Sequence, residues 1–184
     1  MKIQQLVVLA SCVYLAALVA TVYFARATTR RVLGAVAGGL AVAVVGFGVE
    51  VVCQALGFWR YPSEDTGYGP LPMYPLLVLA WGVLSLIGWR VIRRFGWRGE
   101  VVFLAVVAAQ GTLRDYIEAG QALGVIAFAP GIGTLLLDVF LWGALTALAQ
   151  GVMRLVAGPA AADPLSRPPK KANYGTATAE RDNA

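Results

Sequence analysis

Long apolar stretches separated by short polar segments dominate the sequence. A bilayer core of about 30 Å is spanned by roughly 20 mostly apolar residues in a helix. The pattern therefore predicts an all-α, polytopic membrane helix bundle of about five transmembrane helices. The expected helices cover residues 6–24, 32–53, 76–89, 101–121 and 134–155.

The fourth expected helix is the least regular, because its purely apolar part covers only residues 101–109. A helix that short cannot cross a bilayer, so it must continue through Gln110 and Arg114 to about residue 121, unless the segment is re-entrant. A continuous helix brings Arg114, Asp115 and Glu118 into the membrane. The pattern thus predicts charged side chains at membrane depth.

The last part of the chain differs from the bundle in composition. Gly158 and Pro159 end the final apolar stretch, and the residues beyond are rich in Ala, Pro and charge, without a periodic apolar face. This composition is typical of disorder. We therefore expect residues 1–158 to form the transmembrane bundle and residues 159–184 to form a disordered cytoplasmic tail.

The Lys and Arg residues predict the orientation of the bundle. Only Lys2, Arg60 and Arg114 lie on one side of the expected membrane, and the other 12 of the 15 basic residues lie on the opposite side. Short cytoplasmic loops carry an excess of positive charge. The count predicts an N-out/C-in protein of the bacterial cytoplasmic (inner) membrane, and an even number of helices would break the alternation.

Composition agrees with a membrane protein and argues against other classes. Hydrophobic residues make up 59% of the chain and charged residues 14%, whereas soluble proteins average roughly 45–50% and about 25%. The net charge of +5 comes from short clusters between apolar stretches. No basic face is predicted, so we expect no nucleic-acid partner.

Metal and cofactor chemistry has few candidate residues. The chain has no histidine, and its two cysteines, Cys12 and Cys53, lie in apolar stretches without CxxC spacing. Neither a phosphate-binding glycine loop nor a metal-binding spacing of carboxylates occurs. We therefore expect no cofactor and no metal, and acid–base work would fall to carboxylates, Lys, Tyr or Cys.

Ionisable residues gather in the outer half of the expected membrane on three helices. The group contains one base, Arg114, and four carboxylates: Glu50, Asp115, Glu118 and Asp138. An unpaired charge at membrane depth costs at least about 2.5 kcal/mol, so such groups face the interior, pair, or line a wet cavity. If they share a cavity, Arg114 can hold one or two of them ionised while desolvation keeps another protonated.

A protonated buried carboxyl group is a competent general acid. We therefore predict the four carboxylates as catalytic and Arg114 as a substrate-binding residue. The alternative stays open that Arg114, Asp115 and Glu118 are solvated at the interface and that Glu50 makes a structural polar contact.

Residues 57–75 are dense in Gly, Pro and aromatic residues, which predicts an irregular interfacial loop. Its Trp59, Tyr61 and Tyr68 are either interfacial anchors or a lid over the cavity. Trp142 lies four residues after Asp138 and shares its helix face. Under the second alternative, these four aromatic residues would contact the ligand.

The stretch 50–81, EVVCQALGFWRYPSEDTGYGPLPMYPLLVLAW, resembles membrane-embedded isoprenoid enzymes of the carotenoid-biosynthesis and terpene-cyclase type. Those families combine a helix-borne acid, an aromatic Gly/Tyr/Pro loop and a following helix with Trp. The resemblance implies that Glu50 and Asp138 supply the proton that starts cyclisation or hydration of a polyene. Aromatic faces would stabilise the cation. Gly82 stands where terpene cyclases often have an acid.

Two other functional classes stay open. In a non-catalytic membrane subunit or assembly factor, the charged residues would hold the bundle together or bind a membrane-protein partner. A small proton-coupled transporter would need a homo-oligomer to enclose a path. For the enzyme, the expected partner is a membrane lipid or an isoprenoid-like apolar ligand.

Overall fold

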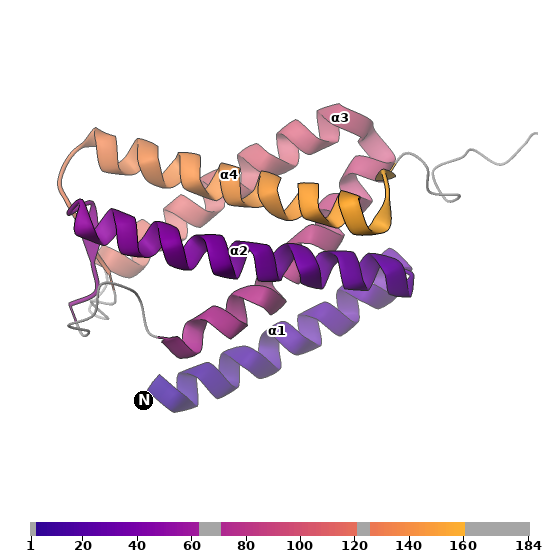
Figure 1. The fold of residues 1–184 in the computed structure, drawn as a ribbon, viewed down its shortest axis with the longest axis horizontal. Helices are drawn as coiled ribbons and strands as arrows, with labels where there is room; N and C mark the ends of the chain where they lie inside the picture. Colours follow the sequence, from indigo (N-terminus) through magenta and orange to yellow (C-terminus); the bar gives the residue numbers. More distant parts are fainter. Residues whose placement is uncertain (1–2, 63–70, 121–125, 161–184) are drawn as a thin grey trace, which may run out of the picture.

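The computed structural model describes residues 3–62, 71–120 and 126–160, and most of them are helical. The elements in chain order are α1 (Ile3–Ala25), α2 (Thr29–Ala55), β1 (Trp59–Arg60), the 3-10 helix η1 (Leu71–Met73), α3 (Tyr74–Gly120), β2 (Ala127–Phe128) and α4 (Ile132–Ala157). The all-α prediction is confirmed (Figure 1). Residues 161–184 of the predicted tail lie outside the described residues.

Helix α3 differs most from the sequence prediction, which places a basic loop at residues 90–100. The segment is helical except at Gly96, which has φ 63° and ψ −148°. Glycine adopts a positive φ readily because it has no Cβ atom. A turn at Gly96 thus takes the place of the predicted loop. Figure 1 shows the chain turning back on itself within α3. We call the parts before and after Gly96 the first and second arms.

Four of the described helices, α1 to α4, are long and apolar enough to cross a membrane. The 47 residues of α3 would extend roughly 70 Å if straight, about twice a bilayer core. Large apolar side chains such as Val19, Phe24, Val44 and Phe140 are more than 60% exposed. A membrane supplies the apolar surroundings that these side chains need, so the chain has the features of a membrane protein.

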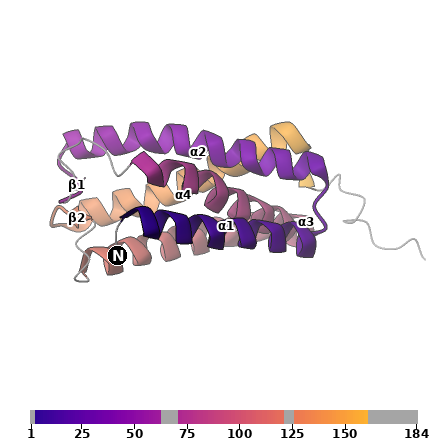
Figure 2. The same ribbon diagram turned by 90° about the horizontal axis from the view of Figure 1, so that it is seen from below.

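Helices α2, α3 and α4 pack together, and α1 packs against α3 (Figures 1 and 2). Glycines allow the closest approaches. A Cβ atom at Gly38 would overlap the backbone of Ala149 on α4, and one at Gly39 would overlap the backbone of Val78 on α3. Small residues let membrane helices approach in this way. Gly38 and Gly39 thus let α4 and α3 lie close against α2.

One end of the bundle carries most of the described arginines, and we call it the arginine end. It comprises the α1–α2 connection, residues 90–100 of α3 and the end of α4. Arg30 Nε donates to the Val156 carbonyl oxygen at 2.7 Å, and Arg154 pairs with Glu100 at 2.5 Å. These contacts join helix ends that are far apart in sequence.

The opposite end carries a two-stranded antiparallel sheet, and we call it the sheet end (Figure 2). Trp59 pairs with Phe128 and Arg60 with Ala127. The Ala129 amide also donates to the Phe58 carbonyl oxygen at 2.8 Å. The connection that follows α2 is thereby fixed to the one that precedes α4. The N-terminus of α1 lies at this same end.

Candidate functional site

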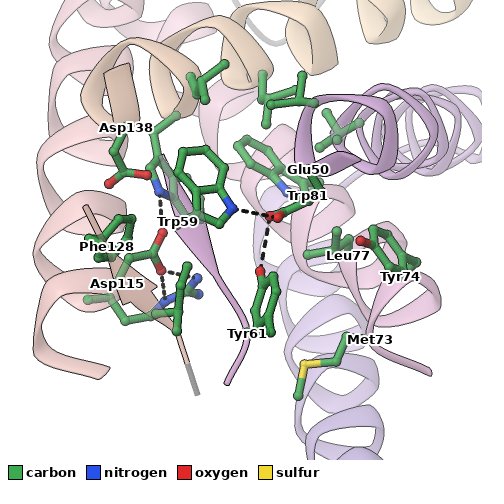
Figure 3. Close-up of a pocket in the computed structure, with 18 residues that line it drawn as sticks. Glu50, Trp59, Tyr61, Met73, Tyr74, Leu77, Trp81, Asp115, Phe128 and Asp138 are labelled. Atoms are coloured by element: carbon green, nitrogen blue, oxygen red, sulfur yellow. Dashed lines mark hydrogen bonds and ion pairs between the residues drawn. The ribbon is translucent and has the colours of Figure 1, made fainter. Parts of the chain in front are cut away.

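A cavity of about 220 Å³ lies at the sheet end, between α2, both arms of α3, α4 and the small sheet (Figure 3). Its wall is mainly apolar and aromatic. One arginine and three carboxylate residues also line it: Arg114, Glu50, Asp115 and Asp138. An apolar cavity of about 150 Å³ can hold benzene, so this one has room for a somewhat larger apolar group.

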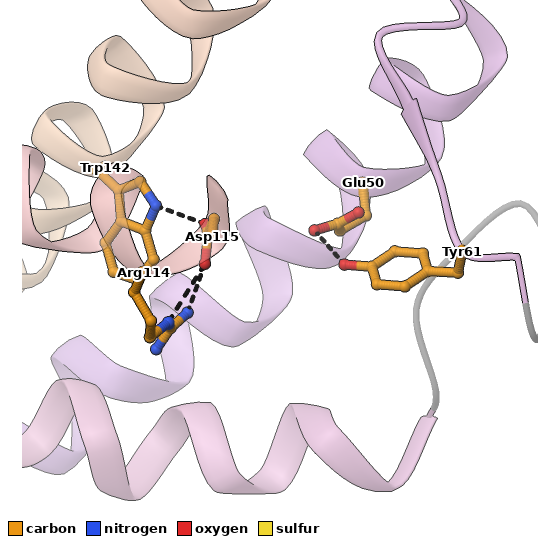
Figure 4. Close-up of polar contacts among 5 residues, drawn as sticks. All are labelled: Glu50, Tyr61, Arg114, Asp115 and Trp142. Carbon is orange, nitrogen blue, oxygen red and sulfur yellow. Dashed lines mark hydrogen bonds and ion pairs between the residues drawn. The ribbon is translucent and has the colours of Figure 1, made fainter. Parts of the chain in front are cut away.

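Glu50, near the end of α2, accepts hydrogen bonds at both carboxylate oxygens. Trp59 Nε1 donates to Oε2 at 2.8 Å, and the Tyr61 hydroxyl donates to Oε1 at 3.1 Å (Figures 3 and 4). Burial, and then the charge of Glu50, raise the pKa of Tyr61 far above its usual range. The phenol therefore stays protonated and remains a donor to Glu50.

The small sheet explains how Trp59 reaches Glu50. Trp59 is 5% exposed, and its ring lies edge-on to Phe128 with centroids 6.0 Å apart. Phe128 in turn stacks on Tyr116 of α3, with centroids 4.4 Å apart and ring planes 3° apart. Backbone pairing and ring packing together hold the indole N–H toward the carboxylate.

Asp115, on the second arm of α3, also accepts at both oxygens. Arg114 donates to Oδ1 from Nη2 at 2.9 Å and from Nε at 3.2 Å, and Trp142 Nε1 donates to Oδ2 at 2.8 Å (Figure 4). The guanidinium of Arg114 also lies 5.1 Å from the Trp142 ring centroid, within cation–π range. Trp142 thus contacts both members of the ion pair.

The structure pairs Arg114 with the adjacent Asp115. Helix spacing also allows a pair between Arg114 and Glu118, which are four residues apart, and the Glu118 side chain lies outside the described part. Gly111 contributes to this arrangement, because a Cβ atom there would overlap the Trp142 ring. The missing side chain lets Trp142 lie against α3, where its indole reaches Asp115.

Asp138 of α4 is 6% exposed and differs from the other two carboxylates. Its Oδ2 atom is fully buried and meets no hydrogen-bond partner among the described residues. Thr112 of α3 interacts electrostatically with it, yet Thr112 Oγ1 is also buried without a partner in hydrogen-bond geometry. Buried polar atoms usually have partners, so Asp138 Oδ2 differs from the carboxylate oxygens of Glu50 and Asp115, which all accept hydrogen bonds.

Aromatic faces cover much of the remaining wall. Trp142 of α4 stacks on Trp81 of α3 with centroids 5.4 Å apart and planes 24° apart. Tyr74, Leu77 and Met73 line the side toward the start of α3 (Figure 3). The electron-rich face of an indole attracts a cation. The site therefore combines carboxylates with surfaces suited to a positively charged apolar group.

Seven of the nine candidate residues predicted from the sequence line this one cavity: Glu50, Trp59, Tyr61, Arg114, Asp115, Asp138 and Trp142. Tyr68 and the side chain of Glu118 lie outside the described part. The cavity is also lined by residues that were not among the predicted candidates: Trp81, Tyr74, Phe128 and Met73. Trp81 could have been suspected from the helix that follows the aromatic loop.

Within the described ranges, no group of three or more His, Cys, Asp or Glu residues could hold a metal ion. The described site offers three carboxylates, one arginine and several aromatic rings. No protein-family model, curated protein or solved structure matches the chain.

Proposed function

We propose that the protein is a lipid-phase enzyme that protonates an isoprenoid-type alkene and so starts its hydration or cyclisation. The observation that carries the proposal is Asp138, whose side chain lines an aromatic cavity and whose buried Oδ2 atom has no hydrogen-bond partner among the described residues. A general acid of this kind must reach its substrate within hydrogen-bond distance. In the proposal, the cavity holds the alkene beside Asp138.

Hydrogen-bond accounting supports Asp138 as the proton donor. An ionised carboxylate can only accept hydrogen bonds, and Glu50 and Asp115 each accept at both oxygens. Those two groups therefore suit the ionised state. Asp138 Oδ2 accepts none from the described residues, which makes it the oxygen best able to carry a proton.

In the proposed reaction, the Asp138 proton adds to one carbon of a double bond and leaves a positive charge on the other. The Trp81 ring and the charges of Glu50 and Asp115 then stabilise that cation. Attack by water followed by loss of one proton completes a hydration. Attack by a second double bond of the same chain followed by proton loss completes a cyclisation, and either proton restores Asp138.

The size of the cavity supports a ligand of which only one end enters the cavity. If a cavity of about 150 Å³ holds the six carbons of benzene, the 220 Å³ here correspond to roughly nine carbons, or about two isoprene units. Sites for complete drug-sized molecules are larger, about 300–1,000 Å³. We infer that the terminus of an isoprenoid chain lies in the cavity while the rest extends into the lipid.

The proposed orientation has five membrane crossings, with the two arms of α3 as separate crossings. The arginine end then faces the cytoplasm of a bacterium by the positive-inside rule, and the cavity lies in the outer leaflet. With Ser166 of the predicted tail changed to Cys, we expect a membrane-impermeant thiol reagent to label the tail only from the cytoplasmic side. Labelling from outside would overturn the orientation.

Comparison of extracted lipids tests the enzymatic proposal. In cells that carry the Glu50→Gln variant, we expect at least about 100-fold less of the product, because the charge that faces the cation is lost. Insertion of the variant into the membrane is checked first. Unchanged lipids together with a lost protein complex would favour an assembly factor, and a pH-dependent flux lost with the variant would favour a transporter.

A further inference from the structure

A second hollow, of about 280 Å³, lies at the arginine end between α1 and the first arm of α3. We call it the arginine groove. It is distant from the cavity of the proposed function and shares no residue with it. Four of its apolar wall residues are Phe24, Ile87, Val91 and Phe95, and two of its wall residues are charged, Arg90 and Arg94. The groove thus combines an apolar wall with two positive charges.

The two arginines lie one helical turn apart and therefore share a face of α3. Arg90 Nη1 donates to the Phe24 carbonyl oxygen at 2.5 Å, which fixes its side chain across the groove. A guanidinium has five N–H donors, so others stay available. Arg94 is exposed, and its guanidinium lies 5.3 Å from the Phe95 ring centroid. Each of the two guanidinium groups therefore has one contact within the protein and N–H groups that can still donate to a ligand.

Among the residues that the structure describes, no carboxylate lines the arginine groove, and the acid at this end, Glu100, pairs with Arg154 of α4. Within that part of the chain, Arg90 and Arg94 therefore make the groove positive. Two guanidinium groups beside an apolar wall are complementary to a ligand that has both an anionic headgroup and a hydrocarbon chain.

We infer that the arginine groove binds an anionic phospholipid of the leaflet on that side. The lipid phosphate accepts hydrogen bonds from Arg94 and from the remaining N–H groups of Arg90. One acyl chain lies against Ile87 and Val91 and continues along α1. This inference uses the membrane location of the bundle and is independent of the chemistry at the other end.

Binding of defined lipids to the purified full chain tests the inference. The chain is exchanged into detergent, and native mass spectrometry measures retention of phosphatidylglycerol and of phosphatidylcholine. We expect phosphatidylglycerol to bind more tightly, and the Arg94→Gln variant to weaken its binding at least about fivefold, in line with the energy of one arginine beside an anionic lipid surface.

Arg98→Gln is the matched control, because it removes the same charge from the same end of the bundle, four residues further along α3. Arg98 is exposed, lies 5.9 Å from the Trp97 ring centroid and is not part of the groove. The Arg98→Gln variant should bind phosphatidylglycerol as tightly as the unchanged protein does. Equal weakening by both variants, no preference over phosphatidylcholine, or displacement of the lipid by inorganic phosphate alone would each overturn the inference.

Discussion

Replacement of Asp138 by Asn is expected to lower the rate of product formation by at least about 100-fold without loss of the folded protein. Asn has nearly the same size, but its amide cannot supply an acidic proton. Because Asp138 Oδ2 has no hydrogen-bond partner among the described residues, the exchange breaks no contact that the structure records there. Product per amount of folded membrane protein is the quantity to measure, beside thermal stability.

Asp138→Glu serves as the comparison, since it keeps the acid and moves it by one methylene group. It should retain more activity than Asp138→Asn. An Asp138→Asn variant with full activity, or one whose activity falls only in proportion to the amount of folded protein, would exclude Asp138 as the proton donor.

The second large effect is expected at Gly46, which lines the cavity from α2. A Cβ atom there would meet no other atom within 4 Å, so a larger side chain can extend into the empty space. We expect Gly46→Leu to block the ligand and to lower product formation at least about tenfold, a loss that corresponds to about 1.4 kcal/mol. Stability should stay unchanged or rise, because glycine costs a helix about 1 kcal/mol.

Gly48→Leu is the matched control for Gly46→Leu. Gly48 lies two residues further along the same helix, is exposed, and also has no atom within 4 Å of an added Cβ. Its variant adds the same volume outside the cavity. Equal activity of the two variants would contradict the proposal that the cavity holds the substrate.

The helices could be predicted from the sequence because length and apolarity determine a membrane span. The expected ranges 6–24, 32–53 and 134–155 correspond to α1, α2 and α4. Residues 90–100 could not be predicted as helix, because a basic run with glycines resembles a loop. Gly96 reverses the chain at a single residue with φ 63°, and a positive φ at one glycine leaves no signal in the pattern.

The charged residues of the candidate site could be predicted from the sequence, whereas most of the contacts between its residues could not. The cost of an ionisable group at membrane depth indicated Glu50, Arg114, Asp115 and Asp138 as interior residues. The donors to Glu50 depend on a pairing of residues 59–60 with residues 127–128. Strands of two residues are too short to show a period of two, so this pairing could not be read from the sequence.

The ion pair shows a second limit of sequence spacing. The structure pairs Arg114 with the adjacent Asp115, and Trp142 from α4 donates to that carboxylate and lies beneath the guanidinium. Spacing within one helix cannot show this contact from another helix.

The central claim is that the cavity holds the substrate and that Asp138 donates the proton. The most direct test compares lipids extracted in parallel from cells that carry the unchanged protein, Asp138→Asn, Gly46→Leu or Gly48→Leu. Mass spectrometry and chromatography compare the isoprenoid-type lipids, since hydration adds the mass of water and cyclisation changes only retention. We expect one lipid that is present in cells with the unchanged protein or Gly48→Leu and is lost from cells with Asp138→Asn or Gly46→Leu. Identical lipids from all four would contradict it.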